Sequence, residues 1–280
     1  MDDGKTLNYS IAIVHCPSSK LKYMKAKKSY GQHFLNRPDI AEKIAESLML
    51  TETYPRVLEI GPGQGALTKF LINKPFTLKL VEADADMSAA IHKNFLNFNP
   101  DNILTRDFLK LELSKVFENQ PFCLIGNYPY NISTQILFAM IDNYALVPEM
   151  VGMFQREVAE RVVAPPGSKV YGIISVLVQA FYEGKLLFGV DKNCFTPPPN
   201  VQSAVIRLVR KENTNLGCNE KLFRRVVKQA FSQRRKMLRN TLKIFFPKDD
   251  GLLLEPFFEK RPEQLSLEEF INLTKRIDIG

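Results

Sequence analysis

The sequence contains no tryptophan and very little histidine or cysteine. Among its 280 residues there are three histidines and four cysteines, and no two cysteines form a CxxC pair. Structural zinc sites use such ligands at close, regular spacing, so the sequence predicts no metal site. Isolated cysteines are also typical of a protein in a reducing compartment, which predicts a cytoplasmic location rather than export.

Long apolar runs are missing as well. No segment approaches the roughly 20 apolar residues of a membrane-spanning helix. The apolar run at 11–14 is too short for the core of a signal peptide. We therefore predict that the protein has no membrane association.

Two segments lack acidic residues and concentrate the net charge of +8. Residues 20–28 contain five lysines, and residues 221–243 contain nine lysines and arginines. Clusters of unopposed positive charge indicate a polyanionic partner, most often a nucleic acid. A solubilising surface is the alternative, but nine unopposed cations in one segment favour the nucleic-acid interpretation.

Short apolar segments alternate with helical patterns through most of the chain. Strands are predicted at 57–60, 78–81, 103–104, 122–125 and 150–154. Helices are predicted from Asn36, an N-cap candidate before Pro38, and at 66–72, 87–95, 134–140 and 158–163. A helix at 172–183 and an antiparallel strand pair at 186–190 and 203–209 follow. This alternation predicts an α/β fold with a parallel sheet covered by helices on both faces.

The composition of the chain also predicts its domain boundaries. Residues 1–23 lack periodicity and precede Met24, where the lysine-rich region continues, so they are predicted to be an extension that is disordered or not native. Near residue 211 the composition becomes polar, and only helical patterns follow. The predicted domains are therefore 24–211, which contains the sheet, and 212–280, which is small and all-helical. Nothing in the pattern indicates a coiled coil, so a monomer is expected.

Polar groups follow four successive predicted strands. The turn 59–65 (EIGPGQG) has GxGxG spacing after an acid, which differs from the GxGxxG spacing of dinucleotide-dependent oxidoreductases. Glu82 ends the second strand, where a carboxylate can accept both hydroxyls of a ribose, and Asp107 follows the third, placed to accept from an adenine amino group. Each acid alone would more often be a helix cap or a solvated loop residue. Because the carboxyl ends of parallel strands meet at one edge, together they predict a nucleoside-binding site.

The motif Asn127-Tyr128-Pro129-Tyr130 follows the fourth predicted strand. The lone pair of an adenine amine is delocalised into the ring, and two acceptors aimed at its hydrogens would free that lone pair for methyl transfer. The Asn127 side-chain oxygen and the Tyr128 carbonyl can be those acceptors, with Pro129 restricting the backbone between the two tyrosines. Tyr130 offers a ring on which an extruded base can stack. An ordinary turn with two core tyrosines remains the alternative for the tetrapeptide alone.

Six segments together resemble the KsgA family of small-subunit ribosomal RNA adenine dimethyltransferases, over about residues 25–275. They are 31–36 (GQHFLN), 59–65 (EIGPGQG), 127–133 (NYPYNIS), 195–199 (FTPPP), 203–208 (SAVIRL) and 231–236 (FSQRRK). The resemblance implies a Rossmann-like class I methyltransferase sheet, a small helical C-terminal domain, and S-adenosylmethionine as cofactor.

The resemblance also implies roles for single residues. Cofactor contacts are expected from His33 and Leu35 near the methionine part, Gly61 beneath the cofactor, Glu82 at the ribose, Asp107 at the adenine, and Asn127. Phe195 is expected to be a second aromatic wall around the flipped base. Two positions depart from the family pattern, with His33 where many relatives have Asn and Tyr128 where Leu is usual. Because only the Tyr128 carbonyl is needed for chemistry, activity is expected to survive while the ring changes local packing.

The acid-free segment near the C-terminus predicts an RNA-binding surface. An apolar helical stripe that includes Phe223, Val227 and Phe231 is interrupted by consecutive cations before it resumes at Leu238. Two helices joined by a cationic turn can grip phosphates. The predicted RNA contacts are Arg224, Arg225, Lys228, Arg234, Arg235 and Lys236.

The predicted function is dimethylation of the amino groups of two adjacent adenosines near the 3′ end of 16S ribosomal RNA, coupled to small-subunit biogenesis. The expected partners are that RNA and the small ribosomal subunit. Two alternatives are a large-subunit ribosomal RNA adenine dimethyltransferase of the antibiotic-resistance type and a ribosome-assembly factor without turnover. The segment 195–208 favours the small-subunit family, and Glu82, Asp107 and Asn127 together argue against a factor that only binds.

Overall fold

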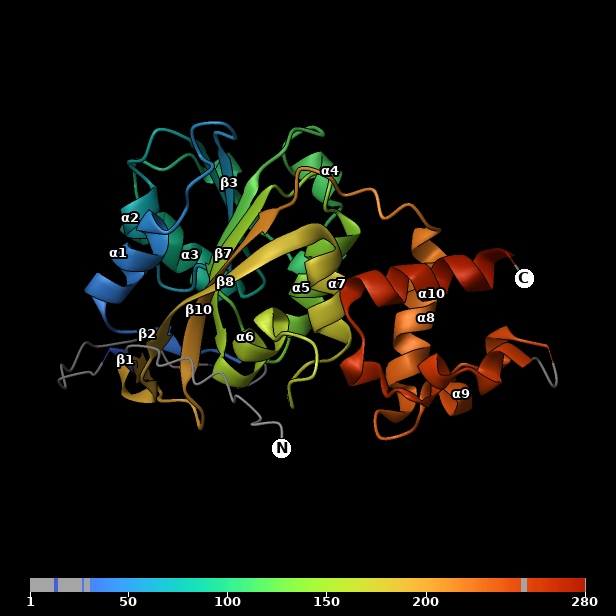
Figure 1. Cartoon of the computed structure of the whole chain (residues 1–280). Helices are drawn as coiled ribbons and strands as arrows, with labels where there is room; N and C mark the ends of the chain where they lie inside the picture. The colour runs from blue at the N-terminus through green and yellow to red at the C-terminus, as the bar shows by residue number, and fades with distance from the viewer. Residues whose placement is uncertain (1–12, 15–26, 28–30, 248–250, 280) are drawn as a thin grey trace.

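An eight-stranded sheet runs through the N-terminal three quarters of the chain in a computed structural model, which describes residues 13–14, 27, 31–247 and 251–279 (Figure 1). Its strands are β1 (Ile13–Val14), β3 (Arg56–Ile60), β4 (Thr77–Glu82), β5 (Ile103–Thr105), β6 (Cys123–Asn127), β7 (Glu149–Gln155), β8 (Tyr182–Val190) and β10 (Ser203–Arg210). They lie in the order β1-β8-β10-β7-β6-β3-β4-β5. The strands β3 to β7 pair in parallel, as predicted, and β10 is antiparallel to both neighbours.

The direction in which strands are added reverses between β3 and β6. The strands β4 and β5 lie on one side of β3, whereas β6 and β7 lie on the other. Loops leaving the carboxyl ends of β3 and β6 therefore diverge, and open α/β sheets bind ligands at such a point.

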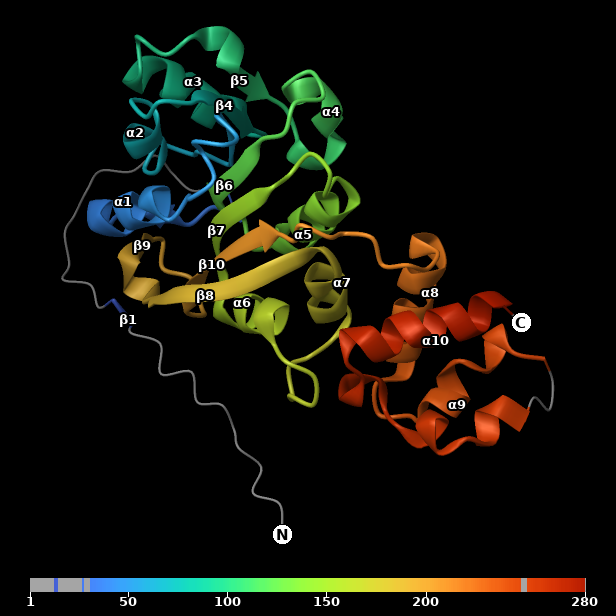
Figure 2. The same cartoon turned by 45° about the horizontal axis from the view of Figure 1, so that its top comes forward.

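Alternating side chains on the strands fill two apolar layers, one on each face of the sheet. Val57 and Ile125 face one layer, and Leu58 and Leu124 face the other. The first face is covered by α1 (Pro38–Glu46), α2 (Thr68–Leu71) and α3 (Ala85–Asn94). The second is covered by α4 (Leu113–Val116), α5 (Ser133–Asp142), α6 (Arg156–Val163) and α7 (Ile173–Phe181) (Figure 2). The predicted helix-covered sheet is thus confirmed.

The C-terminal part is helical and packs beside α7 (Figures 1 and 2). It contains α8 (Glu220–Ala230), α9 (Leu238–Thr241), α10 (Leu267–Ile279) and several short 3-10 turns, with no strand among its described residues. Its apolar side chains, such as Phe223 and Phe270, continue the apolar layer under the second face of the sheet. The Tyr171 hydroxyl also donates to the Leu265 carbonyl at 3.1 Å. The two parts therefore share one core.

Local details differ from the sequence predictions in three places. The N-cap of α1 is Arg37, not Asn36, because Asn36 directly follows a short strand at residues 34–35 and its side chain donates to the Thr196 hydroxyl. The strand β8 begins at Tyr182, so it takes over the end of the helix predicted at 172–183. Residues 13–14, inside the predicted disordered extension, pair in parallel with β8. The rest of 1–23, and Met24, lie outside the described residues.

Candidate active site

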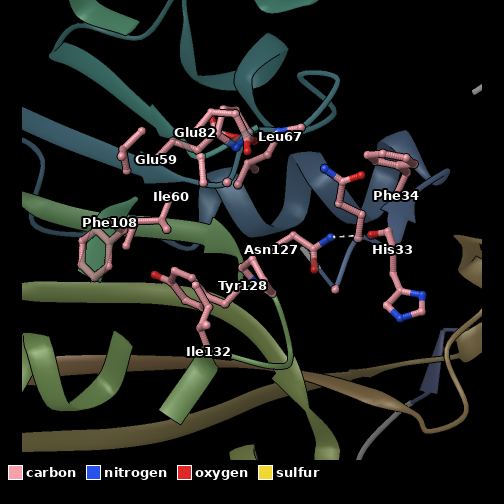
Figure 3. A pocket seen from close by; sticks show the side chains of 18 of the residues that line it. His33, Phe34, Glu59, Ile60, Leu67, Glu82, Phe108, Asn127, Tyr128 and Ile132 are labelled. Atoms are coloured by element: carbon pink, nitrogen blue, oxygen red, sulfur yellow. Dashed lines mark hydrogen bonds between the residues drawn. The ribbon is translucent and has the colours of Figure 1, made fainter. Parts of the chain in front are cut away.

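A cavity of about 430 Å³ opens at the carboxyl edge of the sheet, where β3 and β6 diverge. Its lining comes from residues 31–35, the turn after β3, the ends of β4 and β5, and the loop after β6, as Figure 3 shows in close-up. Among the predicted residues it brings together His33, Leu35, Gly61, Glu82, Asp107, Asn127, Tyr128, Pro129 and Tyr130. The volume lies in the range of pockets that hold small organic cofactors.

The turn after β3 lines the cavity with backbone atoms of glycines, which have no side chain to cover them. Gly61 and Gly63 have φ values of +66° and +56°, which residues with a Cβ rarely adopt. The Gly61 amide donates to the Val81 carbonyl at 2.9 Å, and the Gly63 amide donates to the Glu82 carboxylate at 3.0 Å. The turn is therefore tied to the end of β4 while its backbone stays open to a ligand.

Glu82 ends β4 and is 6% exposed. One carboxylate oxygen accepts from the Gly63 amide and the other from the Asp84 amide, each at 3.0 Å. Burial raises the pKa of Glu82 above its ordinary value, although the backbone hydrogen bonds oppose the shift. Because each oxygen has a second lone pair, the group can still accept from two ribose hydroxyls.

Asp107 follows β5 and serves two purposes. Its Oδ1 accepts from the Leu109 amide at 3.0 Å and so caps the 3-10 helix Phe108–Lys110. The same residue lines the cavity, beside the buried Phe108 ring. A helix cap and a ligand contact were alternatives for this acid, and the geometry permits both because a carboxylate has two oxygens.

Asn127 ends β6, and a hydrogen bond fixes the orientation of its amide. Its Nδ2 donates to the His33 carbonyl at 3.1 Å, the bond drawn dashed in Figure 3. Because a carbonyl can only accept, this bond assigns the nitrogen to the His33 side of the amide. The Oδ1 atom is then left as an acceptor for a group in the cavity.

The Tyr128 ring, which departs from the family pattern, packs against β6 and β7. It is 1% exposed, and its hydroxyl donates to the Val151 carbonyl at 3.2 Å. Two glycines make room for it, because a Cβ at Gly126 would come within 2.9 Å of the ring and a Cβ at Gly152 would overlap it. The ring therefore anchors the loop after β6 to the sheet.

Tyr130 and Phe195, the two expected aromatic walls, differ in their placement relative to the cavity. The Tyr130 hydroxyl shares a hydrogen bond with the Ser203 hydroxyl, and its ring lines the cavity. Phe195 is 2% exposed and lies outside the cavity lining. It pairs with Leu35 in a two-stranded sheet of β2 (Phe34–Leu35) and β9 (Phe195–Thr196), and its ring joins the core beneath. Its role as a second wall around a flipped base therefore stays a prediction, and the ring is buried in the core of this structure.

Glu59 was given no role from the sequence, yet its carboxyl group lies in the wall of the cavity. It is 1% exposed and accepts a hydrogen bond of 2.8 Å from the Thr68 hydroxyl. Burial raises the pKa of Glu59 to about 8, and the neighbouring charge of Glu82 adds to the shift. An acid inside an otherwise apolar strand was the signal that could have identified it.

The segment that carries His33 is tied to the start of α3. Lys27 Nζ lies 2.7 Å from a carboxylate oxygen of Asp84, and Gln32 Nε2 donates to the other oxygen at 3.0 Å. Asp84 is buried, lies two residues after Glu82 and caps α3. These contacts, which no sequence pattern predicted, hold residues 31–35 across the cavity.

A family model described as "Ribosomal RNA adenine dimethylase" matches residues 23–277. The chain belongs to the ribosomal RNA adenine dimethylase family. Two similar curated relatives are both named Ribosomal RNA small subunit methyltransferase A. The one from Phocaeicola vulgatus is 51% identical over 255 residues, which cover 91% of this chain and 90% of the relative. The one from Flavobacterium johnsoniae is 50% identical over 258 residues, which cover 92% and 98%.

Solved structures show the same fold as this chain. A dimethyladenosine transferase from Plasmodium falciparum aligns with a TM-score of 0.72 and 26% identity, over 88% of this chain and 98% of that one. The 23S rRNA methyltransferase ErmE aligns with a TM-score of 0.65 and 22% identity, over 88% and 99%. The predicted class I methyltransferase fold is confirmed.

The basic residues predicted to contact RNA fall into three pairs. Arg224 pairs with Asp142 on α5, and Arg234 donates to the Lys169 carbonyl at 2.5 Å. Arg225 and Lys228 lie over the rings of Phe245 and Phe138, at 5.6 and 5.9 Å from the ring centroids. Arg235 and Lys236 are exposed on the turn after α8. The side chains of Arg224 and Arg234 thus tie the helical part to α5 and to the connection between α6 and α7.

Within the described residues, no cluster of three or more histidine, cysteine or acidic side chains has the arrangement of a metal site. In the same part of the chain, no helix of this adenine dimethylase is both long and apolar enough to cross a lipid bilayer.

Proposed function

We propose that the protein dimethylates the amino groups of two adjacent adenosines near the 3′ end of 16S ribosomal RNA, within the small subunit. The observation that carries this proposal is the orientation of Asn127, whose Oδ1 is left as an acceptor at the cavity. The names of the curated relatives, which refer to the small subunit, support that substrate over large-subunit RNA. A factor that only binds RNA would not need an oriented acceptor there.

The family is one of methyltransferases that use S-adenosylmethionine, and the cavity fits this cofactor. When bound, the cofactor supplies a methyl group activated by a positively charged sulfur. Glu82 would accept from its ribose hydroxyls, and Asp107 would accept from its adenine amine. The buried Nε2 of Gln64 has no hydrogen-bond partner among the described residues, so this lining residue has a donor to offer.

The loop after β6 would prepare the target amine. Asn127 Oδ1 and the Tyr128 carbonyl would each accept a hydrogen bond from one amine hydrogen. These bonds would reduce the delocalisation of the nitrogen lone pair into the ring and free it for methyl transfer. The neighbouring carbonyls are engaged elsewhere, since Pro129 accepts from the Ile132 amide at 3.2 Å and Tyr130 from the Ser133 hydroxyl at 3.2 Å. The loop is thereby held before substrate arrives, and catalysis would come from positioning and hydrogen bonding.

The helical part would hold the RNA while the target base enters the cavity. Exposed Arg235 and Lys236 would contact phosphates, and a splayed single-stranded segment would reach Asn127. We expect a cytoplasmic enzyme that acts as a monomer on a partly assembled small subunit.

Labelled S-adenosylmethionine and purified protein test the proposal directly. Small-subunit particles from cells that lack the modification should acquire label that digests to dimethyladenosine. Large-subunit RNA and duplex DNA should remain unlabelled. Label mainly in large-subunit RNA would support the antibiotic-resistance type of enzyme, and cofactor binding without label in any RNA would support an assembly factor.

A further inference from the structure

The Tyr128 ring fills a slot between β6 and β7 that two glycines leave open. Gly126 and Gly152 are register partners on these two parallel strands. A Cβ on Gly126 would lie 2.9 Å from the Cε1 atom of the ring, and a Cβ on Gly152 would overlap the ring. The ring can occupy the slot because neither strand carries a Cβ at this level of the sheet.

Two hydrogen bonds to β7 fix Tyr128 at both ends. Its backbone amide donates to the Met153 carbonyl at 3.2 Å, and its hydroxyl donates to the Val151 carbonyl at 3.2 Å. The ring also packs on Phe154, with ring centroids 4.8 Å apart. Pro129 follows directly and has a restricted φ. The peptide that carries the Tyr128 carbonyl thus lies between two constrained residues, so a shift of the ring would move that carbonyl.

The two acceptors at the end of β6 are therefore fixed by independent contacts. Asn127 is oriented by its hydrogen bond to the His33 carbonyl, whereas Tyr128 is held by β7. In Figure 3 the Tyr128 hydroxyl points away from Asn127. Burial raises the pKa of Tyr128 further above its ordinary value, so the hydroxyl remains a protonated donor at neutral pH. A change confined to the Tyr128 side chain can thus disturb one acceptor and leave the other in place.

We propose that the Tyr128 ring is a positioning residue for methyl transfer, because its seat in the slot at Gly126 and Gly152 sets the place of the Tyr128 carbonyl. The two hydrogens of an amine have fixed directions, so both acceptors must stand in the right places at the same time. A displacement of about 1 Å at one group can lower turnover by roughly 10²-fold. The ring acts on the reaction through its own carbonyl and not through a contact with the base. This inference rests on the proposed function.

Substitutions at position 128 can test the ring alone, because every residue keeps the backbone carbonyl. Tyr128→Phe keeps the ring and loses the hydroxyl bond, whereas Tyr128→Leu also leaves part of the slot empty. Tyr182→Phe and Tyr182→Leu are the matched controls. Tyr182 is also fully buried, and its hydroxyl donates at 2.9 Å to the Val147 carbonyl, which precedes β7 at the opposite end of that strand from the cavity. The measurements are kcat and KM for unmodified small-subunit particles, S-adenosylmethionine affinity by calorimetry, and melting temperature.

Tyr128→Leu should lower kcat by roughly tenfold to a hundredfold, while KM for the particles and cofactor affinity stay within about threefold of wild type. Tyr128→Phe should retain most of the turnover, with kcat lower by about twofold to fivefold, because the ring still fills the slot. The Tyr182 variants should lose a similar amount of melting temperature and, at a temperature where they are folded, turn over as wild type does.

A double variant tests whether the ring acts through the slot. Gly152→Ala should lower kcat by itself, because the new Cβ overlaps the Tyr128 ring and displaces it. In the Tyr128→Leu background the same change should lower kcat little further, so the two losses should not multiply. The Gly126 carbonyl lies 2.8 Å from the same Cβ, but this contact is present in both backgrounds and cancels in the comparison.

Several results would overturn the inference. Wild-type kcat in Tyr128→Leu would mean that the ring only packs, and an equal loss of kcat in Tyr182→Leu would assign the effect to stability. A higher KM or weaker cofactor binding with unchanged kcat would make the ring a ligand contact. Losses that multiply in the double variant would mean that the ring does not act through the slot.

Tyr128→Phe keeps the test decisive if Tyr128→Leu does not fold. Equal kcat in Tyr128→Phe, Tyr182→Phe and the wild-type protein would then overturn the inference. If the wild-type protein labels no RNA, the proposed function fails and this inference with it. That result is distinct from an active wild-type protein with unaffected Tyr128 variants.

Discussion

At the carboxyl edge of the sheet, polar side chains are fixed by hydrogen bonds and still have free acceptor positions for a ligand. On α8 and the turn after it, however, several cationic side chains contact groups of the protein itself. Asn127 donates through Nδ2 and keeps Oδ1, and Glu82 accepts from two amides and keeps a lone pair on each oxygen. Arg224, by contrast, pairs with Asp142, which neutralises much of its charge toward a distant phosphate. An amide or carboxylate that is fixed by hydrogen bonds can still bind a ligand, because it has further hydrogen-bonding positions. A cation in an ion pair loses most of its electrostatic attraction for phosphate.

The largest effect is expected at the edge of the sheet, from Asn127→Ala. Loss of an acceptor that acts mainly in the transition state should reduce turnover by roughly 10²–10³-fold, with RNA and cofactor binding changed little. Single-turnover methylation of small-subunit particles measures this. Asn94→Ala, at an exposed position ending α3, is the control. If Asn127→Ala turned over at nearly the wild-type rate, the motif would have a structural role only. The sheet edge would then not differ from the basic segment in keeping groups for a ligand.

Glu82→Ala should weaken S-adenosylmethionine binding by roughly tenfold to a hundredfold, because two ribose hydroxyls lose their acceptor in a partly dry site. Calorimetry with the isolated protein gives the affinity. Glu183→Ala, an exposed acid on β8, should leave it unchanged. Equal cofactor affinity in Glu82→Ala and wild type would contradict the assignment of Glu82.

Glu59→Gln should remove the part of the pH dependence of folding stability that comes from the buried Glu59 carboxyl group. Burial raises the pKa of Glu59 to about 8, so the folded state retains a proton that the unfolded state releases near pH 4.5. Its contribution to stability is therefore complete below about pH 4.5 and is lost as pH rises to about 8, by up to about 1.4 kcal/mol per pH unit. Thermal unfolding between pH 5 and 8 should show a smaller decline for the variant. An identical decline would mean that Glu59 is not the responsible group.

The smallest effects are expected in the basic segment, and paired variants separate its two kinds of cation. Arg235→Ala with Lys236→Ala should lower RNA affinity and flatten its dependence on salt by about one to two units of slope, with no change in melting temperature. Arg224→Ala with Arg234→Ala should instead lower stability by about 1 kcal/mol, since partly exposed ion pairs and carbonyl contacts are lost. Binding titrations at several salt concentrations and thermal unfolding measure both. The distinction fails if the two double variants have the same salt slope.

Sequence patterns predicted the parallel strands well because strand identity depends on local hydrophobic periodicity. The five parallel strands lie within two residues of their predicted bounds, and Glu82 and Asn127 end β4 and β6. The structure gives Phe195 and Arg224 intramolecular contacts that their sequence patterns did not indicate. An aromatic ring beside three prolines, or an arginine on an amphipathic helix, has the same sequence pattern whether it faces a ligand or another part of the protein. The burial of Phe195 depends on pairing with Leu35, 160 residues earlier in the chain.

The sequence by itself determined the α/β architecture, the convergence of Gly61, Glu82, Asp107 and Asn127, and the positive charge of the C-terminal helices. These follow from short-range periodicity and from the rule that parallel strands end at one edge. Only the tertiary structure decided which way the Asn127 amide points, that His33 stacks on Tyr130, and that Arg224 and Arg234 contact the sheet domain. Each of these depends on contacts between segments far apart in the chain, whose relative placement is set by packing of the shared core.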